Sequence, residues 1–377
     1  MRRDINLHSA LRQTNGVAFL FSTTTALFLL LPVYLHGIGS SPAQIGLVAG
    51  LMRISMLAAR PVAGRLLDRF GRRPVIMAGG LVAIASILSI LVFPQIGFPF
   101  LSFRLIQGVA TALIDSGLGT VVADLAPAAA RTRVFAMYTV WLTLPGGIMP
   151  AAGEAIARHA GFLPLFGAAG LVLATALWVF RRLPETLPNI PEELPQSWSL
   201  GSAGPPVLVG GIMVGFVYGV ASVFVPVAPI ASAPGRVGAF FFAYFVGLFG
   251  MRLGNVFGVT WLARPPILVP AYAFMAIGLA LLPLGNAFFL LVLVGLACGM
   301  GHGTIIPVLY TLLLSGIAKE RRGWAVASLA ASFDTGMILS SMGLGIVAEY
   351  TGYHGIFWLS SLVVASGATF SYFLGRR

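Results

Sequence analysis

Residues Gly64–Pro74 read Gly-Arg-Leu-Leu-Asp-Arg-Phe-Gly-Arg-Arg-Pro, a cluster of charges between two apolar stretches that are each long enough to cross a bilayer. Each charged side chain left in hydrocarbon would cost about 2.5–3.5 kcal/mol, even on a lenient insertion scale. The cluster must therefore lie in water at a membrane face. We expect it to be a short loop that joins two spanning helices.

The composition of the chain is that of an integral membrane protein. Hydrophobic residues make up 58% and charged residues 9% of its 377 residues, and the mean hydropathy is +0.94. A soluble domain has about 25% charged residues. At roughly 20 apolar residues per spanning helix, the chain has room for about twelve helices and little else. We therefore predict an all-α membrane protein.

The net charge of +12 does not indicate nucleic-acid binding, because of where the charges lie. Apart from Lys319 the basic residues are arginines, and most of them fall in short clusters between apolar runs. With the N-terminus in the cytoplasm, 17 basic residues lie in cytoplasmic segments and two, Arg158 and Arg236, on the opposite face. This asymmetry follows the positive-inside rule, and it places both termini in the cytoplasm.

Helices are placed at the uncharged runs, which are cut at glycine, proline and asparagine breaks. The first span is longer than a typical signal-peptide core, so we expect it to be a retained helix. The single cysteine, Cys298, excludes an intrachain disulfide. The predicted spans are 14–36, 43–63, 74–94, 99–123, 134–156, 162–180, 206–231, 238–262, 266–285, 287–315, 323–347 and 353–375.

The chain divides into two similar halves. Segment 184–204 is the one long polar stretch and has four prolines, so it is expected to be a cytoplasmic linker between bundles at 1–183 and 205–377. A shift of 192 residues places Arg252 on Arg60 and Pro266 on Pro74. In the second copy of the charged cluster, Thr260 takes the place of Asp68. We therefore predict two pseudo-symmetric six-helix bundles, of which only the first carries a complete cluster.

Several motifs of this chain resemble those of the major facilitator superfamily of secondary transporters. The pattern Gly-x-Leu-x-Asp-Arg-x-Gly-Arg-Arg from Gly64 resembles its loop between helices two and three. Arg104-Leu-Ile-Gln107-Gly108 resembles the Arg-x-x-Gln-Gly motif of its transport core. The stretch with Gly147, Pro150 and Gly153 resembles its antiporter motif, with Met149 in place of the glycine before the proline. Ala59-Arg-Pro, Pro184-Glu-Thr and Phe333-Asp-Thr-Gly are similar to bacterial drug-efflux and sugar-efflux members.

The charged cluster has two interpretations. The resemblance implies a cytoplasmic latch between the two bundles, made by Asp68, Arg69 and Arg72. Independently, a helix that begins near Arg322 would present partly positive amides to which Asp68 could dock, and glycines at 64 and 71 would permit close approach. The alternative is that these charges only orient the protein in the membrane.

Charges within the predicted helices are costly and mark candidate substrate or proton-coupling sites. Arg104 and Asp115 share one helix face with Gly108 and Thr111, which we expect to line the central cavity. They are about 16 Å apart along the helix, too far to pair with each other. Asp334 lies near the midplane, where burial would favour a protonated carboxylate. Structural ion pairing or packing is the alternative for Arg104, Asp115, His302 and Asp334. The full set of candidates is Arg104, Gln107, Asp115, His302 and Asp334.

These features predict a protein that moves a small organic compound across the inner membrane by alternating access, with proton-coupled efflux favoured. Uptake of a sugar, organic anion or other nutrient is the main alternative, and a sensor or assembly protein without transport is a second. The sequence lacks nucleotide-binding and hydrolase motifs, so no enzyme activity, cofactor or metal is expected. The expected partners are the substrate, protons and the lipid bilayer, and the expected state is a monomer. The arginines in the helices favour a neutral or acidic compound that contacts Arg104.

Overall fold

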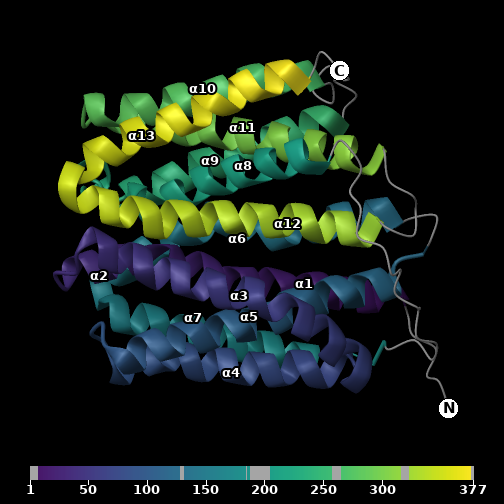
Figure 1. Cartoon of the computed structure of the whole chain (residues 1–377). Coiled ribbons are helices and arrows are strands. Elements are labelled where there is room, and N and C mark those ends of the chain that lie inside the picture. The colour runs from purple at the N-terminus through teal and green to yellow at the C-terminus, as the bar shows by residue number, and fades with distance from the viewer. Residues whose placement is uncertain are drawn as a thin grey trace. The chain divides into compact units, whose positions relative to one another are not determined.

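A computed structural model of the chain describes residues 7–127, 131–183, 185–186, 204–256, 265–315 and 322–374. In these ranges the regular structure is entirely helical (Figure 1). The α-helices are α1 (Leu7–Leu27), α2 (Leu31–Gly37), α3 (Pro42–Phe70), α4 (Arg72–Val92), α5 (Phe98–Leu125), α6 (Arg131–Ala160), α7 (Phe162–Phe180), α8 (Gly204–Val223), α9 (Arg236–Val256), α10 (Leu268–Leu281), α11 (Phe288–Ser315), α12 (Arg322–Ile338) and α13 (Leu344–Leu374). The shorter elements are the 3-10 segments η1 (Phe28–Leu30), η3 (Val225–Val227), η4 (Pro229–Ala231), η6 (Pro265–Ile267) and η7 (Leu282–Leu284), and the π-helical segment η9 (Leu339–Gly343).

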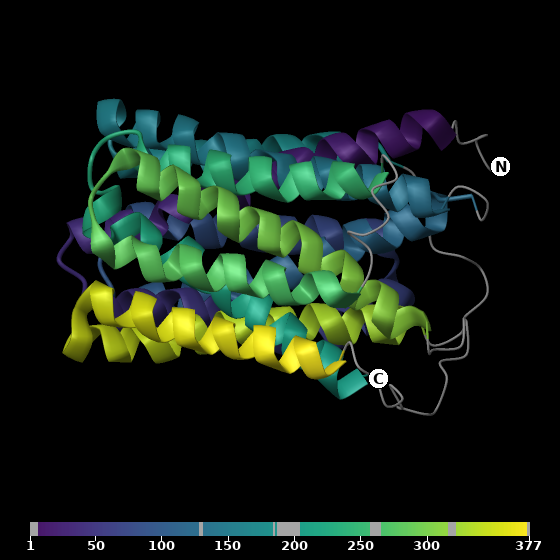
Figure 2. The ribbon, with the colours of Figure 1, turned by 90° about the horizontal axis from the view of Figure 1, so that it is seen from above.

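Eleven stretches of the described residues are long and apolar enough to cross a membrane. The last of them, Ala325–Thr369, has 45 residues, about twice the length that a bilayer requires. Within it, Gly352 has the non-helical angles φ 67° and ψ −176°. The yellow ribbon turns back on itself there (Figure 2). This break divides the stretch into two spans, so the predicted count of twelve is confirmed.

The charged cluster is not the loop that the sequence predicted. Helix α3 continues through it to Phe70, α4 begins at Arg72, and only Gly71 lies outside a helix. A one-residue connection is possible because Gly71 has φ 95°, a conformation that costs glycine little. The 29 residues of α3 correspond to roughly 44 Å at the usual helical rise. Helix α3 is therefore long enough for its last turns to extend beyond the hydrocarbon.

Most other predicted boundaries lie close to those of the structure, and 162–180 coincides with α7. The predicted span 206–231 is wrong at its end, because α8 stops at Val223 and two 3-10 segments follow. Each of these segments contains a proline, Pro226 or Pro229, which lacks the amide hydrogen that a helix interior needs. Most of the predicted linker, as well as Thr260 and Lys319, lies outside the described residues.

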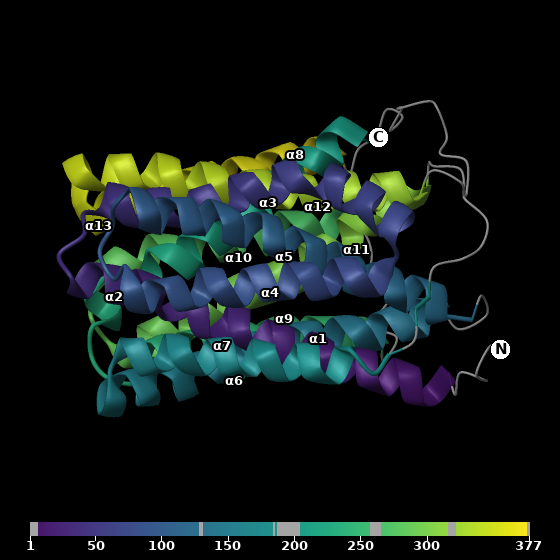
Figure 3. The ribbon, with the colours of Figure 1, turned by 90° about the horizontal axis from the view of Figure 1, so that it is seen from below.

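The chain forms two compact units. The bundle boundaries at 1–183 and 205–377 stay a prediction. The first unit comprises Met1–Leu31 and Leu51–Glu193. In it α1 packs against α6 and α7 (Figure 3), and α4 packs against α5 and α7. Its core is a cluster of buried residues from α1, α3, α4, α5, α6 and α7, among them Ile76 of α4 and Ile114 of α5. Thr24 of α1 also donates a hydrogen bond to the carbonyl of Ala169 in α7 (3.2 Å).

The second unit comprises Pro32–Gly50 and Leu194–Arg377. Its closest helix pairs are α9 with α11 and α8 with α12, and α10 packs against α13. The first residues of α3 belong to this unit. Ser41, which precedes α3, donates a hydrogen bond to the carboxylate of Glu349 in α13.

Candidate functional site

The charged cluster is organised around the side chain of Arg72, which is only 5% exposed. Its Nε donates to Asp124 Oδ2 at the end of α5 (3.0 Å). Its Nη1 donates to the carbonyl of Leu67 (3.0 Å) and to Asp68 Oδ1 (3.2 Å), both in the last turn of α3. A guanidinium has five donors in a fixed plane, so this one side chain connects the ends of three helices.

Glu185, which follows α7, completes this arrangement. Its two carboxylate oxygens accept hydrogen bonds from the backbone amides of Arg72 and Arg73, each 2.9 Å long. A carboxylate is favoured at this position because the first amides of a helix have no partner within the helix and carry partial positive charge. Thr186 Oγ1 then donates to Asp124 Oδ2 (2.9 Å). Three segments that are distant in sequence therefore meet at one polar cluster.

Three of the predicted latch residues, Asp68, Gly71 and Arg72, lie in this cluster. Asp68 and Arg72 form an ion pair at 3.2 Å. Gly71 lies against Glu185, where an added Cβ would be 2.8 Å from Oε2. Arg69 instead lies over the ring of Phe70, 5.3 Å from its centroid, and a Cβ on Gly64 would meet nothing within 4 Å. Gly71 is thus closely approached by Glu185 of its own unit, and the role of both glycines in a latch between the bundles stays a prediction.

The sequence reasoning missed Asp124 and Glu185 as members of this cluster. Both had a signal. Asp124 is an acid directly after the predicted apolar span 99–123, and Glu185 belongs to the Pro-Glu-Thr stretch. Neither is adjacent to Arg72 in sequence, and only the packing of α4 against α5 and α7 brings them to it.

Arg104 of α5 is buried in the first unit, with 6% exposure. Its Nη1 donates to Oε1 of Gln107, and its Nη2 lies 3.3 Å from the sulfur of Met52 in α3. Its guanidinium also lies over the ring of Phe28 at 5.9 Å. The two candidate residues Arg104 and Gln107 thus form one buried hydrogen-bonded pair. It is bounded by α3 and by η1.

The predicted polar face of α5 is covered by α3 at Gly108. A Cβ there would overlap the carbonyl of Met52 and the hydroxyl of Ser55. The expectation that this face lines an open cavity is therefore wrong at Gly108, because the missing side chain lets the two helices touch. Farther along, Asp115 forms an ion pair with Arg60 of α3 at 3.7 Å, and both side chains are about one-quarter to one-third exposed.

The other predicted residues lie on separate helices. Gly147, Pro150 and Gly153 are buried along α6, and a Cβ on Gly153 would lie 2.8 Å from Leu30. In the second unit, Nδ1 of His302 lies 2.7 Å from the hydroxyl oxygen of Tyr244. Asp334 of α12 is 3% exposed. The roles of these residues stay predictions.

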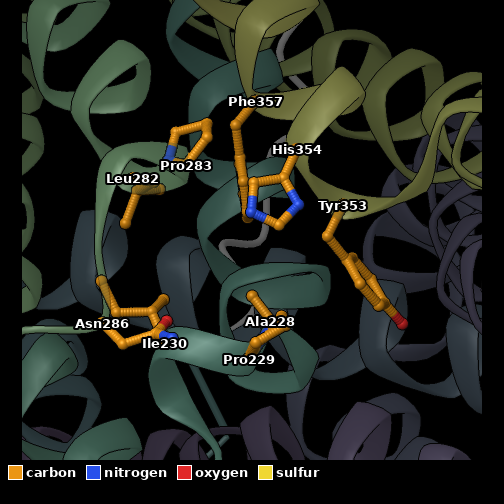
Figure 4. Close-up of a pocket in the computed structure, with 9 residues that line it drawn as sticks. All are labelled: Ala228, Pro229, Ile230, Leu282, Pro283, Asn286, Tyr353, His354 and Phe357. Carbon is orange, nitrogen blue, oxygen red and sulfur yellow. The ribbon is translucent and has the colours of Figure 1, made fainter.

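A small hollow in the second unit contains none of the predicted residues (Figure 4). It is a shallow opening at the protein surface and not an enclosed cavity. Arg236 Nη1 donates to the carbonyls of Ile230 and Asn286, each at 2.7 Å, and so connects two of its walls. Within the described residues, no group of three or more His, Cys, Asp or Glu side chains is placed to hold a metal ion. The hollow is lined by Ala228, Pro229, Ile230, Leu282, Pro283, Asn286, Tyr353, His354 and Phe357.

Comparison with known proteins identifies the family of this chain. The family model described as "Major Facilitator Superfamily" matches residues 15–253. The Staphylopine export protein of Staphylococcus aureus is 22% identical to this chain, over 91% of the chain and 90% of that protein. The Quinolone resistance protein NorA of Staphylococcus aureus is 23% identical, over 78% of each. Among solved structures, the nucleoside transporter NupG has a TM-score of 0.80 at 14% identity, over 97% of this chain and 99% of that one.

Proposed function

Because the chain belongs to the major facilitator superfamily, we propose that it exports a small organic compound across the plasma membrane by alternating access. The observation that carries export is the similarity to Staphylopine export protein over nearly the full length of both chains. The similarity to NorA supports the same direction. Alternating access suits a chain of two six-helix repeats, because one repeat can rock against the other around a substrate site.

We propose that protons drive this export. Asp115 and Asp334 are the candidate carriers, because each is a carboxylate within a membrane-spanning helix, where a titratable group is costly unless it has a role. Asp115 already forms an ion pair with Arg60. A proton on Asp115 would neutralise its carboxylate and so break this ion pair. We further propose a monomer with both termini in the cytoplasm, as the distribution of arginines indicates.

The proposed export is tested by measuring accumulation in bacterial cells with and without the protein. Cells that express it should retain less of the exported compound, and they should tolerate higher concentrations if that compound is toxic. A library of drugs and cell metabolites identifies the compound. An equal metabolite profile in both cell lines, together with equal susceptibility across the library, would exclude export. Greater retention in the expressing cells would instead establish uptake.

Asp68→Asn is expected to slow transport while the protein still inserts in the membrane. The substitution keeps the shape of the side chain but removes the charge that pairs with Arg72 and that we propose docks at a helix N-terminus. A loss of about 1 kcal/mol in the latched state corresponds to roughly a fivefold effect. The measurement is the initial transport rate at equal expression, with Arg65→Gln, an exposed charge in the same helix, as control. A wild-type rate in Asp68→Asn would remove the latch from the mechanism.

A further inference from the structure

Two helix pairs of the second unit approach each other through glycines spaced four residues apart. A Cβ on Gly215 of α8 would overlap the carbonyl of Phe333 in α12, and one on Gly299 of α11 would overlap the carbonyl of Tyr244 in α9. Small residues at such positions let membrane helices pack backbone to backbone. The contact glycines are Gly211, Gly215 and Gly219 on α8 and Gly295, Gly299 and Gly303 on α11.

This close packing brings four rings from four helices together. We call Tyr218 of α8, Tyr244 of α9, His302 of α11 and Phe333 of α12 the aromatic patch. The ring centroids of His302 and Phe333 are 5.5 Å apart, those of Tyr218 and Phe333 5.8 Å, and those of Tyr218 and His302 5.9 Å. These separations are those of interacting rings, so the patch is a continuous aromatic surface rather than an open cage.

One ring of the patch anchors the others. Tyr244 is fully buried, and its hydroxyl shares a hydrogen bond of 2.7 Å with Nδ1 of His302. The rings of Tyr218, His302 and Phe333 are only half-buried. Here three rings keep surface on which a planar molecule could stack.

A basic side chain lies on the helix that carries Tyr244. Arg252 is about two helical turns from Tyr244 along α9 and is half-buried. Among the described residues the ion pairs include none with Arg252. The nearest acid in sequence to the patch, Asp334, is buried. Arg252 is therefore the cationic group toward which an anionic molecule on the patch could be directed.

We propose that the aromatic patch and Arg252 bind a planar aromatic carboxylate, with the ring system stacked on Tyr218, His302 and Phe333 and the carboxylate directed to Arg252. This inference rests on the proposed export function, because it names the class of compound exported. An anion would neutralise an arginine that is costly within a membrane, whereas a permanent cation would be repelled by it. Arg104 of the first unit is less suited to this role, since Gln107, Met52 and Phe28 already surround it.

The proposal is tested by binding measurements on the purified full-length protein in detergent. Three probes share one ring system and differ in charge: 2-naphthoate, 2-naphthylmethanol and 2-naphthyltrimethylammonium. Equilibrium dialysis should show that the naphthoate binds about tenfold more tightly than the alcohol and that the cation binds most weakly. Tighter binding of the cation than of the naphthoate, or no binding of the naphthoate, would overturn the proposal.

Variants then separate the contribution of the ring system to binding from that of the charge. Arg252→Gln should lower naphthoate affinity about tenfold, to that of the alcohol, whereas Arg252→Lys should keep most of it. Phe333→Leu should weaken the binding of both the naphthoate and the alcohol. Tyr218→Leu should do the same, and it serves as the second test if Phe333→Leu does not fold. Phe242→Leu is the matched control, because Phe242 is on α9 but is 58% exposed. Unchanged naphthoate affinity in Arg252→Gln, or in the folded ring variants, would refute the site.

These measurements do not depend on transport, so failure of the site and failure of the proposed function are distinguishable. Binding of naphthoate that follows the variants, in a protein that moves no aromatic carboxylate from cells, would support the site and contradict the export proposal. Export of an identified compound whose rate is unaffected by Arg252→Gln and Phe333→Leu would keep the export proposal and overturn the site.

Discussion

Arg72→Leu is expected to destabilise the first unit strongly and to abolish transport. The substitution leaves Asp124 Oδ2 without the guanidinium at 3.0 Å and leaves the carbonyl of Leu67 without its side-chain donor. Removing one partner of a buried ion pair costs about 3–5 kcal/mol. We expect about 3 kcal/mol, because Asp124 keeps the hydrogen bond from Thr186 and its side chain is 18% exposed.

The measurement is the thermal unfolding of the purified protein, together with its transport rate at equal membrane expression. Arg73→Leu is the matched control, because Arg73 is the next residue, is exposed, and contributes its backbone amide rather than its side chain to the cluster. Arg72→Lys should recover only part of the stability, since an ammonium cannot reproduce the planar donors of the guanidinium. Equal unfolding temperatures for Arg72→Leu and Arg73→Leu would contradict the role given to this cluster.

The second large effect is expected when the proton carrier is removed. Either Asp334→Asn or Asp115→Asn should abolish substrate accumulation against its gradient, because an amide cannot exchange the proton that drives it. One pH unit across the membrane is equivalent to about 1.4 kcal/mol, or a tenfold substrate gradient for one proton per cycle. Vesicles with the wild-type protein should approach that ratio. Vesicles with the carrier variant should stay near one, while downhill exchange of substrate persists.

The experiment uses reconstituted vesicles with an imposed pH difference and the substrate identified from cells. Glu349→Gln is the control, an exposed acid at the end of the same membrane segment as Asp334. If both Asp→Asn variants still drive substrate uphill, neither residue is the carrier. Sodium coupling or facilitated diffusion would then replace proton coupling in the proposal.

Sequence patterns were sufficient to predict the fold because they reflect the free energy of transferring a segment from water to hydrocarbon. That free energy depends mainly on the residues of the segment itself. Uncharged runs of about twenty residues mark spanning helices, and they located α7 to the residue. The same reasoning misjudged Gly64–Pro74. It treated charges as the end of a helix, whereas α3 continues to Phe70. Charge determines where a segment meets water, but it does not end a helix that can extend beyond the hydrocarbon.

The candidate site could be predicted only in part. Asp68 and Arg72 were found because both belong to the charged pattern that begins at Gly64 and resembles a family motif. Asp124 and Glu185 were not found, because they reach Arg72 from the end of α5 and from beyond α7. The glycines of α8 and α11 stand in the sequence at four-residue intervals. Nothing in that spacing identifies the helices that they contact.

The sequence by itself therefore determined the membrane class, the twelve helices and the location of the polar cluster, since these follow from hydropathy and charge along short segments. Only the tertiary structure decided which side chains share a site. It paired Arg60 with Asp115 at 3.7 Å, covered Gly108 with α3, and assembled Tyr218, Tyr244, His302 and Phe333 from four helices. The physical reason is that such contacts depend on how closely helices distant in sequence approach each other. The identity of a side chain's partner on another helix does not show in the hydrophobic periodicity of the side chain's own segment.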